Sequence, residues 1–177
     1  MSEQKTNLVL IGMAGAGKST VGPLLARMLS FDFVDVDDLI EVDQQQSLQE
    51  LVDRHGPAWF RLLEERILLG LELQHHVIAT GGSAVYGEAG MRHLQRSGLL
   101  VYLDVPLAVL AARVGDMESR GLAREKGQSF AQLFAEREPL YRRYADVRIG
   151  CAGKSVAEIC AAIIEAGAGM LGVNSSW

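Results

Sequence analysis

The chain has 177 residues, 49% of them hydrophobic, and a formal net charge of −5 at pH 7. This length predicts one domain over residues 1–177 with a sizeable core, and the acidic balance argues against nucleic-acid binding, which needs a basic surface. The polar N-terminus and the lack of any ~18-residue apolar run predict a soluble cytoplasmic protein with no membrane segment.

A phosphate-binding motif follows the first expected strand, Leu8–Ile11. Residues 12–20 (GMAGAGKST) match G-x-x-x-x-G-K-[ST] at every position. The glycines let backbone N–H groups converge on phosphate oxygens, while Lys18 would reach the β- and γ-phosphates and Ser19 would coordinate Mg²⁺. A helix expected over Ser19–Leu29 would direct its positive N-terminus at the same anion. The sequence therefore predicts a nucleoside triphosphate site.

Short apolar runs alternate with helical patterns along the rest of the chain, which is typical of a parallel sheet between helices. Further strands are expected over Phe33–Asp35, Val77–Ala79, Leu99–Leu103 and Val147–Ile149. Helices are expected over Leu48–His55, Pro57–Leu73, Glu88–Arg96, Pro106–Val114, Ser129–Tyr144 and Ser155–Ala166, the last two starting at capping boxes. We therefore expect a three-layer α/β fold with a five-stranded parallel sheet. The Gly- and Ser-rich tail 167–177 is expected to fray, and Cys151 and Cys160 to be small buried hydrophobic residues.

Two carboxylates stand at the carboxyl end of the second expected strand, where ligands gather in open α/β sheets. In a strand, Asp35 and Asp37 would project to the same face. One could then hold Mg²⁺ through water while the other accepts a proton or a hydrogen bond from an acceptor hydroxyl. The alternative is a cluster that caps a helix, and this explains Asp38, which precedes Leu39.

Two further features bear on the acceptor. Gly81 and Gly82 follow the expected strand Val77–Ala79 and would allow close backbone approach to a ligand, with a plain turn as an equal alternative. Arg61 and Arg137 would suggest an anionic substrate if they converged on one pocket, because guanidinium groups bind carboxylates bidentately. The sequence leaves their convergence open.

Residues 115–128 form a polar, glycine-punctuated segment of the length that marks a lid or a binding loop. Closure of a lid would exclude water, which competes with the acceptor hydroxyl. Arg113, Arg120 and Arg124 favour a lid over a solvated surface loop, since phosphoryl transfer uses cations around the migrating group.

Taken in order, these motifs resemble those of shikimate kinase over roughly 7–149. The matching elements are residues 12–20, Phe33-x-Asp35-x-Asp37, Phe60-Arg61, Gly81-Gly82, Arg120 and Arg137-x-Pro139-Leu140-Tyr141. The resemblance implies the fold of the nucleoside-monophosphate-kinase group, with five parallel strands, a substrate-binding helical region and a mobile lid.

On the donor side, the resemblance implies that Lys18 and the loop hold ATP. The loop residues concerned are Gly12, Ala14, Gly15, Ala16, Gly17, Ser19 and Thr20. Ser19 and Asp35 would serve Mg²⁺, Arg113 would stack near the adenine, and Arg120 would be the lid arginine that closes over the phosphates.

On the acceptor side, the resemblance implies that Asp37 contacts the acceptor hydroxyl as the base. Arg61 and Arg137 would bind the substrate carboxylate, and Gly81 and Gly82 would complete the pocket floor. The implied activity is ATP-dependent phosphorylation of a small hydroxylated acid, most simply of shikimate to shikimate 3-phosphate. We expect the protein to be a monomer.

Two departures from the family pattern lie at the acceptor side and the lid. The family usually has three glycines where this chain has Gly81-Gly82-Ser83, and Arg-Pro-Leu-Leu where this chain has residues 120–123 (RGLA). A related kinase of homoserine or gluconate is therefore an alternative. A nucleotide-dependent switch is less favoured because the N-K-x-D element is absent from the sequence. A nucleoside-monophosphate kinase is disfavoured because Asp35 and Asp37 suit a neutral hydroxyl better than an anionic acceptor.

Overall fold

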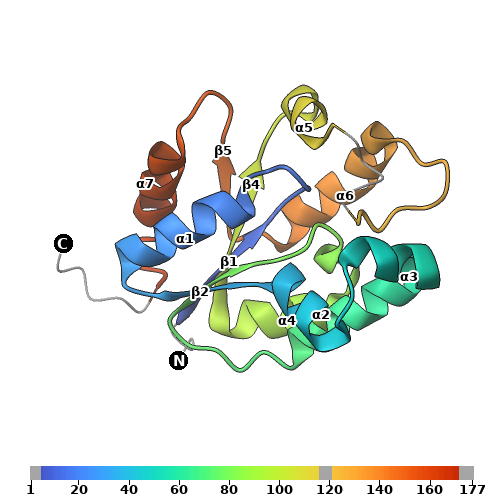
Figure 1. The fold of residues 1–177 in the computed structure, drawn as a ribbon. Helices are drawn as coiled ribbons and strands as arrows, with labels where there is room; N and C mark the ends of the chain where they lie inside the picture. Colours follow the sequence, from blue (N-terminus) through green and yellow to red (C-terminus); the bar gives the residue numbers. More distant parts are fainter. Residues whose placement is uncertain (1–4, 116–120, 172–177) are drawn as a thin grey trace.

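The computed structural model describes residues 5–115 and 121–171, and Figure 1 shows their arrangement. The strands are β1 (Asn7–Ile11), β2 (Asp32–Asp35), β3 (His76–Ala79), β4 (Gly98–Asp104) and β5 (Val147–Gly150). The helices are α1 (Lys18–Leu29), α2 (Val36–Gln44), α3 (Leu48–Leu69), the 3₁₀ helix η1 (Ala84–Tyr86), α4 (Glu88–Ser97), α5 (Leu107–Val114), α6 (Phe130–Tyr144) and α7 (Val156–Gly167). Each predicted strand lies within one residue of its expected bounds.

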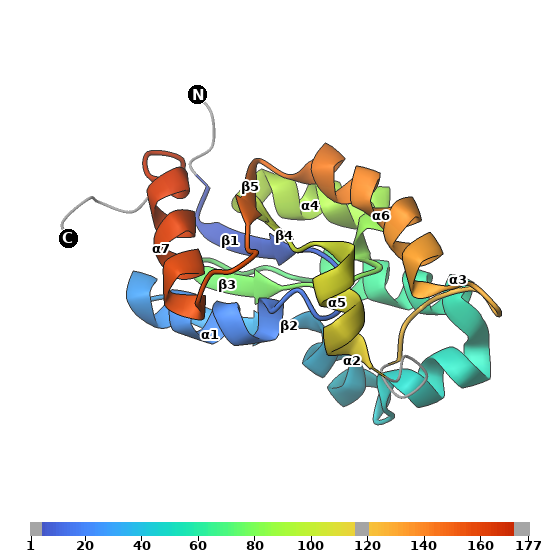
Figure 2. The same cartoon turned by 90° about the horizontal axis from the view of Figure 1, so that it is seen from above.

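The five strands form one parallel sheet in the order β2-β3-β1-β4-β5. The central strand β1 is buried along its whole length, and β4 is buried except at its last residue. Strands covered by helices on both faces need apolar side chains on both sides, and the sequences of β1 and β4 supply them. Figure 2 shows α1 and α7 on one face of the sheet and α4 and α6 on the other. This arrangement confirms the predicted three-layer α/β fold.

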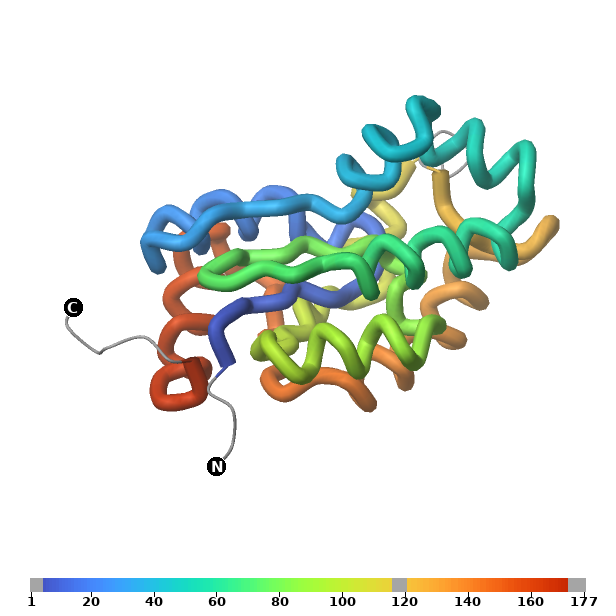
Figure 3. Tube along the Cα trace, turned by 90° about the horizontal axis from the view of Figure 1, so that it is seen from below, coloured from blue at the N-terminus to red at the C-terminus, as the bar shows by residue number. Residues whose placement is uncertain are grey.

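Helix α3 joins the two helices expected over Leu48–His55 and Pro57–Leu73. It kinks at Gly56, whose φ of 82° and ψ of 166° are left-handed values that glycine adopts without steric strain. The helix ends at Leu69, earlier than expected, and its start is fixed by a capping box of Ser47 with Glu50. Figure 3 shows α2 and the start of α3 beyond one end of the sheet, and the direct passage from β2 into α2 identifies this as the carboxyl end.

Helix α1 packs closely on β2 at one point. A Cβ atom at Gly22 would lie 2.3 Å from Cε2 of Phe33, so a glycine is required for this approach. The close packing keeps the start of α1 beside the end of β2, where Ser19 Oγ donates a hydrogen bond to Asp35 Oδ2 at 2.5 Å.

At the C-terminal end of the described part, Leu171 is buried and forms an isolated parallel bridge with Lys5. An apolar side chain gains stability by packing beside α7. The fraying of the tail stays a prediction, and residues 172–177 lie outside the described part. Cys151 and Cys160 are buried and free, as predicted. Across the described residues, no helix has the length and apolar character needed to cross a membrane.

Candidate active site

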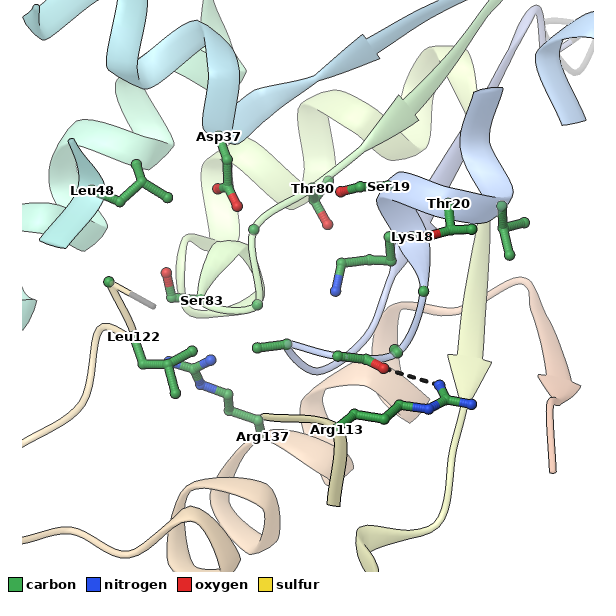
Figure 4. A pocket seen from close by; sticks show the side chains of 18 of the residues that line it. Lys18, Ser19, Thr20, Asp37, Leu48, Thr80, Ser83, Arg113, Leu122 and Arg137 are labelled. Carbon is green, nitrogen blue, oxygen red and sulfur yellow. Dashed lines mark hydrogen bonds between the residues drawn. The ribbon is translucent and has the colours of Figure 1, made fainter. Parts of the chain in front are cut away.

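A pocket of about 640 Å³ lies at the carboxyl ends of β1, β2 and β3 (Figure 4). The predicted residues that line it are Ala14, Gly15, Ala16, Gly17, Lys18, Ser19, Thr20, Asp37, Gly81, Gly82, Arg113 and Arg137. Gly12, Asp35 and Arg61 adjoin this group without lining the pocket, and Arg120 lies outside the described residues. Side chains predicted for the donor and for the acceptor therefore share one cavity.

The predicted phosphate loop joins β1 to α1, and Lys18 is the first residue of that helix. The Lys18 side chain is buried, and its Nζ donates hydrogen bonds to the backbone carbonyls of Gly12 at 2.6 Å and Met13 at 2.7 Å. Burial lowers the pKa of Lys18 to about 8, and the negative charges of Asp37 and Asp35 limit the decrease. The ammonium form still predominates at neutral pH, so the loop places a cation beside its N–H groups.

The two aspartates are close together, but not in the way the strand pattern predicts. Asp35 is the last residue of β2 and the N-cap of α2, where its Oδ1 accepts a hydrogen bond from the backbone N–H of Asp37 at 3.0 Å. Asp37 therefore lies in the first turn of a helix, and the expectation that both project from one strand face is wrong. Asp38 shares that turn, so Asp35 and not Asp38 is the cap. The carboxylate at the N-cap satisfies an otherwise unpaired helix N–H.

Asp37 points into the pocket, as does Lys18 (Figure 4). Burial raises the pKa of Asp37 to about 6, with a further contribution from the charge of Asp35, while Lys18 acts in the opposite direction. A carboxylate with a pKa nearer to neutrality is a better proton acceptor than an ordinary aspartate and is still ionised at pH 7. The geometry therefore fits Asp37 as a general base.

The sequence analysis assigns no role to Glu64, yet this α3 residue is almost fully buried beside the pocket. The Ser83 hydroxyl donates a hydrogen bond to Glu64 Oε2. A Cβ at Gly81 would lie 2.3 Å from Glu64 Oε1 and 2.9 Å from Asp37 Oδ1, so Gly81 leaves space for both carboxylates. Burial raises the pKa of Glu64 to about 7. The serine that departs from the family's third glycine thus binds a buried acid.

The two predicted arginines converge. Arg137 of α6 is 1% exposed, lines the pocket, and donates a hydrogen bond from Nη2 to the carbonyl of Ala123 at 2.7 Å. The guanidinium carbon of Arg61 lies 3.7 Å from the centroid of the Tyr86 ring, and that of Arg137 lies 5.5 Å from the same centroid. One aromatic ring therefore places both cations at the same side of the site, which the sequence leaves open.

Part of the predicted lid is described. The backbone N–H of Gly121 donates a hydrogen bond to Gln49 Oε1 of α3 at 2.7 Å, and Gly121, Leu122 and Ala123 line the pocket. This segment therefore borders the site as predicted, while its mobility stays a prediction.

The opposite end of the pocket has a wall that the sequence analysis does not identify. Lys154, Val156 and Ile159, at the start of α7, line the pocket together with Arg113. Arg113 Nη1 donates a hydrogen bond to the carbonyl of Gly15 at 3.1 Å. The capping box at Ser155 indicates where α7 begins, but no local signal indicates that this end returns to the phosphate loop.

The sheet, the loop after β1, and the carboxylate facing its lysine define a P-loop kinase, a class that transfers a phosphoryl group between a nucleotide and a small molecule bound beside it. The chain matches the shikimate kinase family over residues 14–167. A shikimate kinase from Caldanaerobacter subterraneus is 34% identical over 163 residues, which covers 90% of this chain and 95% of that protein.

Two solved structures are similar over most of their length. The shikimate kinase from Acinetobacter baumannii in complex with shikimate has a TM-score of 0.84 and 30% identity, covering 92% of this chain and 93% of the other. The shikimate kinase from Aquifex aeolicus has a TM-score of 0.79 and 32% identity, covering 92% and 96%. This chain belongs to the shikimate kinase family, whose members are small-molecule kinases that use ATP as the phosphate donor.

Proposed function

We propose that this protein transfers the γ-phosphoryl group of MgATP to a hydroxyl group of shikimate, giving shikimate 3-phosphate. The observation that carries the proposal is that Lys18, Asp37 and Arg137 line one pocket, so a phosphate, a hydroxyl and a carboxylate can be bound together there. Membership of the shikimate kinase family supports shikimate as the acceptor over homoserine and gluconate.

The donor side consists of the phosphate loop and the wall opposite it. Lys18 and the loop N–H groups would bind the β- and γ-phosphates. The Arg113 guanidinium and the apolar side chains of Val156 and Ile159 form two surfaces of suitable chemistry for a flat nucleobase. Arg120 remains the predicted lid arginine.

Ser19 and Asp35 suit a magnesium ion. Their oxygens already lie 2.5 Å apart, and Mg²⁺ prefers a small number of protein oxygen ligands, with water and phosphate oxygens completing its shell. When bound, the ion would neutralise charge on the phosphate oxygens. Asp35 also caps α2, so the same carboxylate orients the helix turn that carries Asp37.

In the transfer step, the acceptor oxygen forms a bond to the γ-phosphorus as the bond between that phosphorus and the ADP oxygen breaks. The hydroxyl proton moves to the carboxylate of Asp37. Lys18 offsets the negative charge around the migrating group, and the rest of the catalysis is positioning. Arg137 and Arg61 would hold the acceptor carboxylate, and Gly81 and Gly82 would admit the acceptor ring close to the backbone.

All of these groups come from one chain. We therefore also propose that residues 1–177 act as a single kinase domain and as a monomer.

The proposal is tested by measuring ADP release with ATP and each of four candidate acceptors: shikimate, homoserine, gluconate and nucleoside monophosphates. We expect kcat/KM for shikimate to exceed that for the others by at least ~100-fold, because a site built to pair polar groups rejects a ligand that leaves them unpaired. Faster turnover of homoserine or gluconate would show that this compound, and not shikimate, is the preferred acceptor.

The base assignment is tested separately with Asp37→Asn. We expect kcat to fall about 1,000-fold, as is typical of losing a general base, with a small change in the KM for ATP. Unchanged turnover would remove Asp37 from this role without affecting the identity of the acceptor.

A further inference from the structure

Tyr86 lies beside both arginines of the acceptor side, Arg61 and Arg137. Tyr86 ends η1, directly after the Gly81-Gly82-Ser83 turn, and it is half-buried. Its ring faces the guanidinium carbon of Arg61 at 3.7 Å and that of Arg137 at 5.5 Å. Arg61 comes from α3 and Arg137 from α6, so one ring links two helices that each contribute a cation.

Two guanidinium groups held near one ring repel each other, since arginine remains protonated in proteins. The ring face is the negative part of the aromatic quadrupole and attracts both cations. Glu136 adds an anion: its Oε1 accepts a hydrogen bond from the Tyr86 hydroxyl and lies 3.9 Å from Arg61 Nη2. Tyr86 and Glu136 together therefore offset the repulsion that would separate the arginines.

The arrangement leaves donors for a ligand. Within the described part of the chain, Nε of Arg61 and Nε of Arg137 are both buried without a hydrogen-bond partner. A buried donor with no partner costs free energy, and an anionic ligand that accepts from it recovers that cost. Contact with the ring face uses no N–H group, so Tyr86 can hold both guanidinium groups while their Nε–H donors stay available.

Glu136 also connects this cluster to the end of the predicted lid. Its Oε2 accepts a hydrogen bond from Gln128 Nε2 at 3.0 Å, and Gln128 precedes the capping residue of α6. Arg124 Nη1 in turn donates to the carbonyl of Gln128 at 2.5 Å. The Tyr86 hydroxyl therefore binds a carboxylate that also binds the last residue of the predicted lid.

We propose that Tyr86 is the positioning residue for recognition of the acceptor's carboxylate. Its ring aligns the guanidinium groups of Arg61 and Arg137, and its hydroxyl keeps Glu136 beside them. This inference rests on the proposed role of the two arginines in binding shikimate. Tyr86 itself makes no contact with the reacting atoms, so its effect passes through the arginines.

The test compares Tyr86→Leu, Tyr86→Phe and Tyr86→Trp by steady-state kinetics with shikimate and ATP varied separately. We expect Tyr86→Leu to raise the KM for shikimate about 10-fold, because the cation–π contact and the hydrogen bond to Glu136 are both lost, with kcat and the KM for ATP changed less than about twofold. Tyr86→Phe keeps the ring and loses the hydroxyl, so its KM should rise about threefold. The KM for shikimate of Tyr86→Trp should be much closer to that of the wild type than the KM of Tyr86→Leu, since indole is the strongest cation–π partner.

A matched control is Tyr144→Leu. Tyr144 lies on α6 with the Arg143 guanidinium carbon 5.6 Å from its ring centroid, so the control removes a similar pair away from the pocket. We expect it to reduce thermal stability and to leave the KM for shikimate unchanged. If Tyr86→Leu and Tyr144→Leu raise that KM equally, the effect is one of general stability and the positioning role is wrong.

A double mutant tests whether Tyr86 acts through Arg61. If it does, Tyr86→Leu in an Arg61→Ala background should raise the KM for shikimate by no more than about threefold further, because most of the coupling is already lost. A full, independent 10-fold increase would overturn the proposal. The proposed function and the role of Tyr86 can fail separately. If the wild-type protein does not phosphorylate shikimate, the proposed function is wrong. If it does and the KM for shikimate is unchanged in Tyr86→Leu, only the role of Tyr86 is wrong.

Discussion

The donor and acceptor sides of this pocket are built in different ways. The donor side comes mainly from nine consecutive residues, 12–20, whose backbone groups and one lysine do the binding. The acceptor side gathers side chains from α2, α3, η1 and α6, far apart in the sequence, and its members include the buried charges of Glu64 and Arg137. A phosphate site can therefore be specified locally, whereas the acceptor site exists only once the whole sheet and its helices have assembled.

The two sides also differ in how their polar groups are satisfied. Donor-side N–H groups belong to a loop and a helix start, where they are normally unpaired until an anion binds. Charged groups on the acceptor side already have some hydrogen-bond partners within the protein. Glu64 accepts from Ser83, and Arg137 donates to the carbonyl of Ala123. We expect substitutions on the donor side to affect rate, and those on the acceptor side, apart from the proposed base Asp37, to affect stability and acceptor affinity.

The largest expected effect comes from Lys18→Ala, which removes the loop cation. We expect kcat to fall about 1,000-fold or more, because this charge offsets the negative charge of the migrating group. Shikimate affinity, measured calorimetrically without nucleotide, should stay within about threefold of wild type, close to the scatter of indirect effects. A parallel loss of shikimate affinity would show that the two sides are not separable.

The next largest effect concerns stability and pH. Burial raises the pKa of Glu64 from 4.5 to about 7, so between these values the native state binds more protons than the unfolded chain. Stability should therefore fall as pH rises through this window, by up to about 3 kcal/mol. Glu64→Gln should remove the part of this dependence that Glu64 contributes when urea unfolding is compared at about pH 5 and about pH 8, and the part due to the raised pKa of Asp37 should remain.

Glu72→Gln is the control for this experiment, since Glu72 is exposed on the surface. It should retain the wild-type difference between the two pH values. If Glu64→Gln retains that difference as well, the buried acid is ionised throughout the range and the raised pKa is wrong.

Arg61→Ala should have a smaller effect, confined to the acceptor. We expect the KM for shikimate to rise about 30-fold, which corresponds to the loss of one charge-assisted hydrogen bond, with the KM for ATP and kcat within about twofold. Arg54→Ala, an exposed arginine on the same helix, is the matched control and should leave both constants unchanged. A change in the KM for ATP alone would contradict the carboxylate assignment.

The smallest effect is local. Gln49→Ala removes the acceptor of the Gly121 N–H, so hydrogen exchange at the Gly121 amide should accelerate by about 5-fold, equivalent to about 1 kcal/mol. Gln46→Ala, in the connection between α2 and α3, is the control. Equal exchange rates in the two variants would mean that the contact with α3 does not hold the segment that begins at Gly121.

The donor side was the more predictable of the two because its signal is contiguous. Periodicity and the motif at 12–20 were sufficient for the five strands, their parallel arrangement and the loop. The aspartates show the limit: Asp35 and Asp37 were correctly grouped, but alternation along a strand cannot reveal that the strand ends at Asp35 and that a helix begins at Val36. The sequence does contain a capping signal, but its pattern favours Asp38, three residues after the actual cap at Asp35.

The acceptor side depended on contacts between distant segments, which have no local signature. Glu64 lies on a helix in which charged residues are usually solvated, and only the structure shows it beneath the turn at Gly81. Tyr86 similarly gave no sign of linking Arg61 to Arg137. The capping box locates the start of α7 in the sequence. That this start lies beside the pocket depends on the order of the strands in the sheet, which no local pattern reveals.

The contact between Gly22 and Phe33 has a consequence for metal dependence. Neither residue lines the pocket, yet we expect their separation to affect how near the hydroxyl of Ser19 comes to the carboxylate of Asp35. If those two oxygens hold the cation as proposed, a single methyl group added at Gly22 would push helix from strand and weaken magnesium binding with every ligand still in place. The affinity for the proposed ion would then depend on how closely α1 packs on β2.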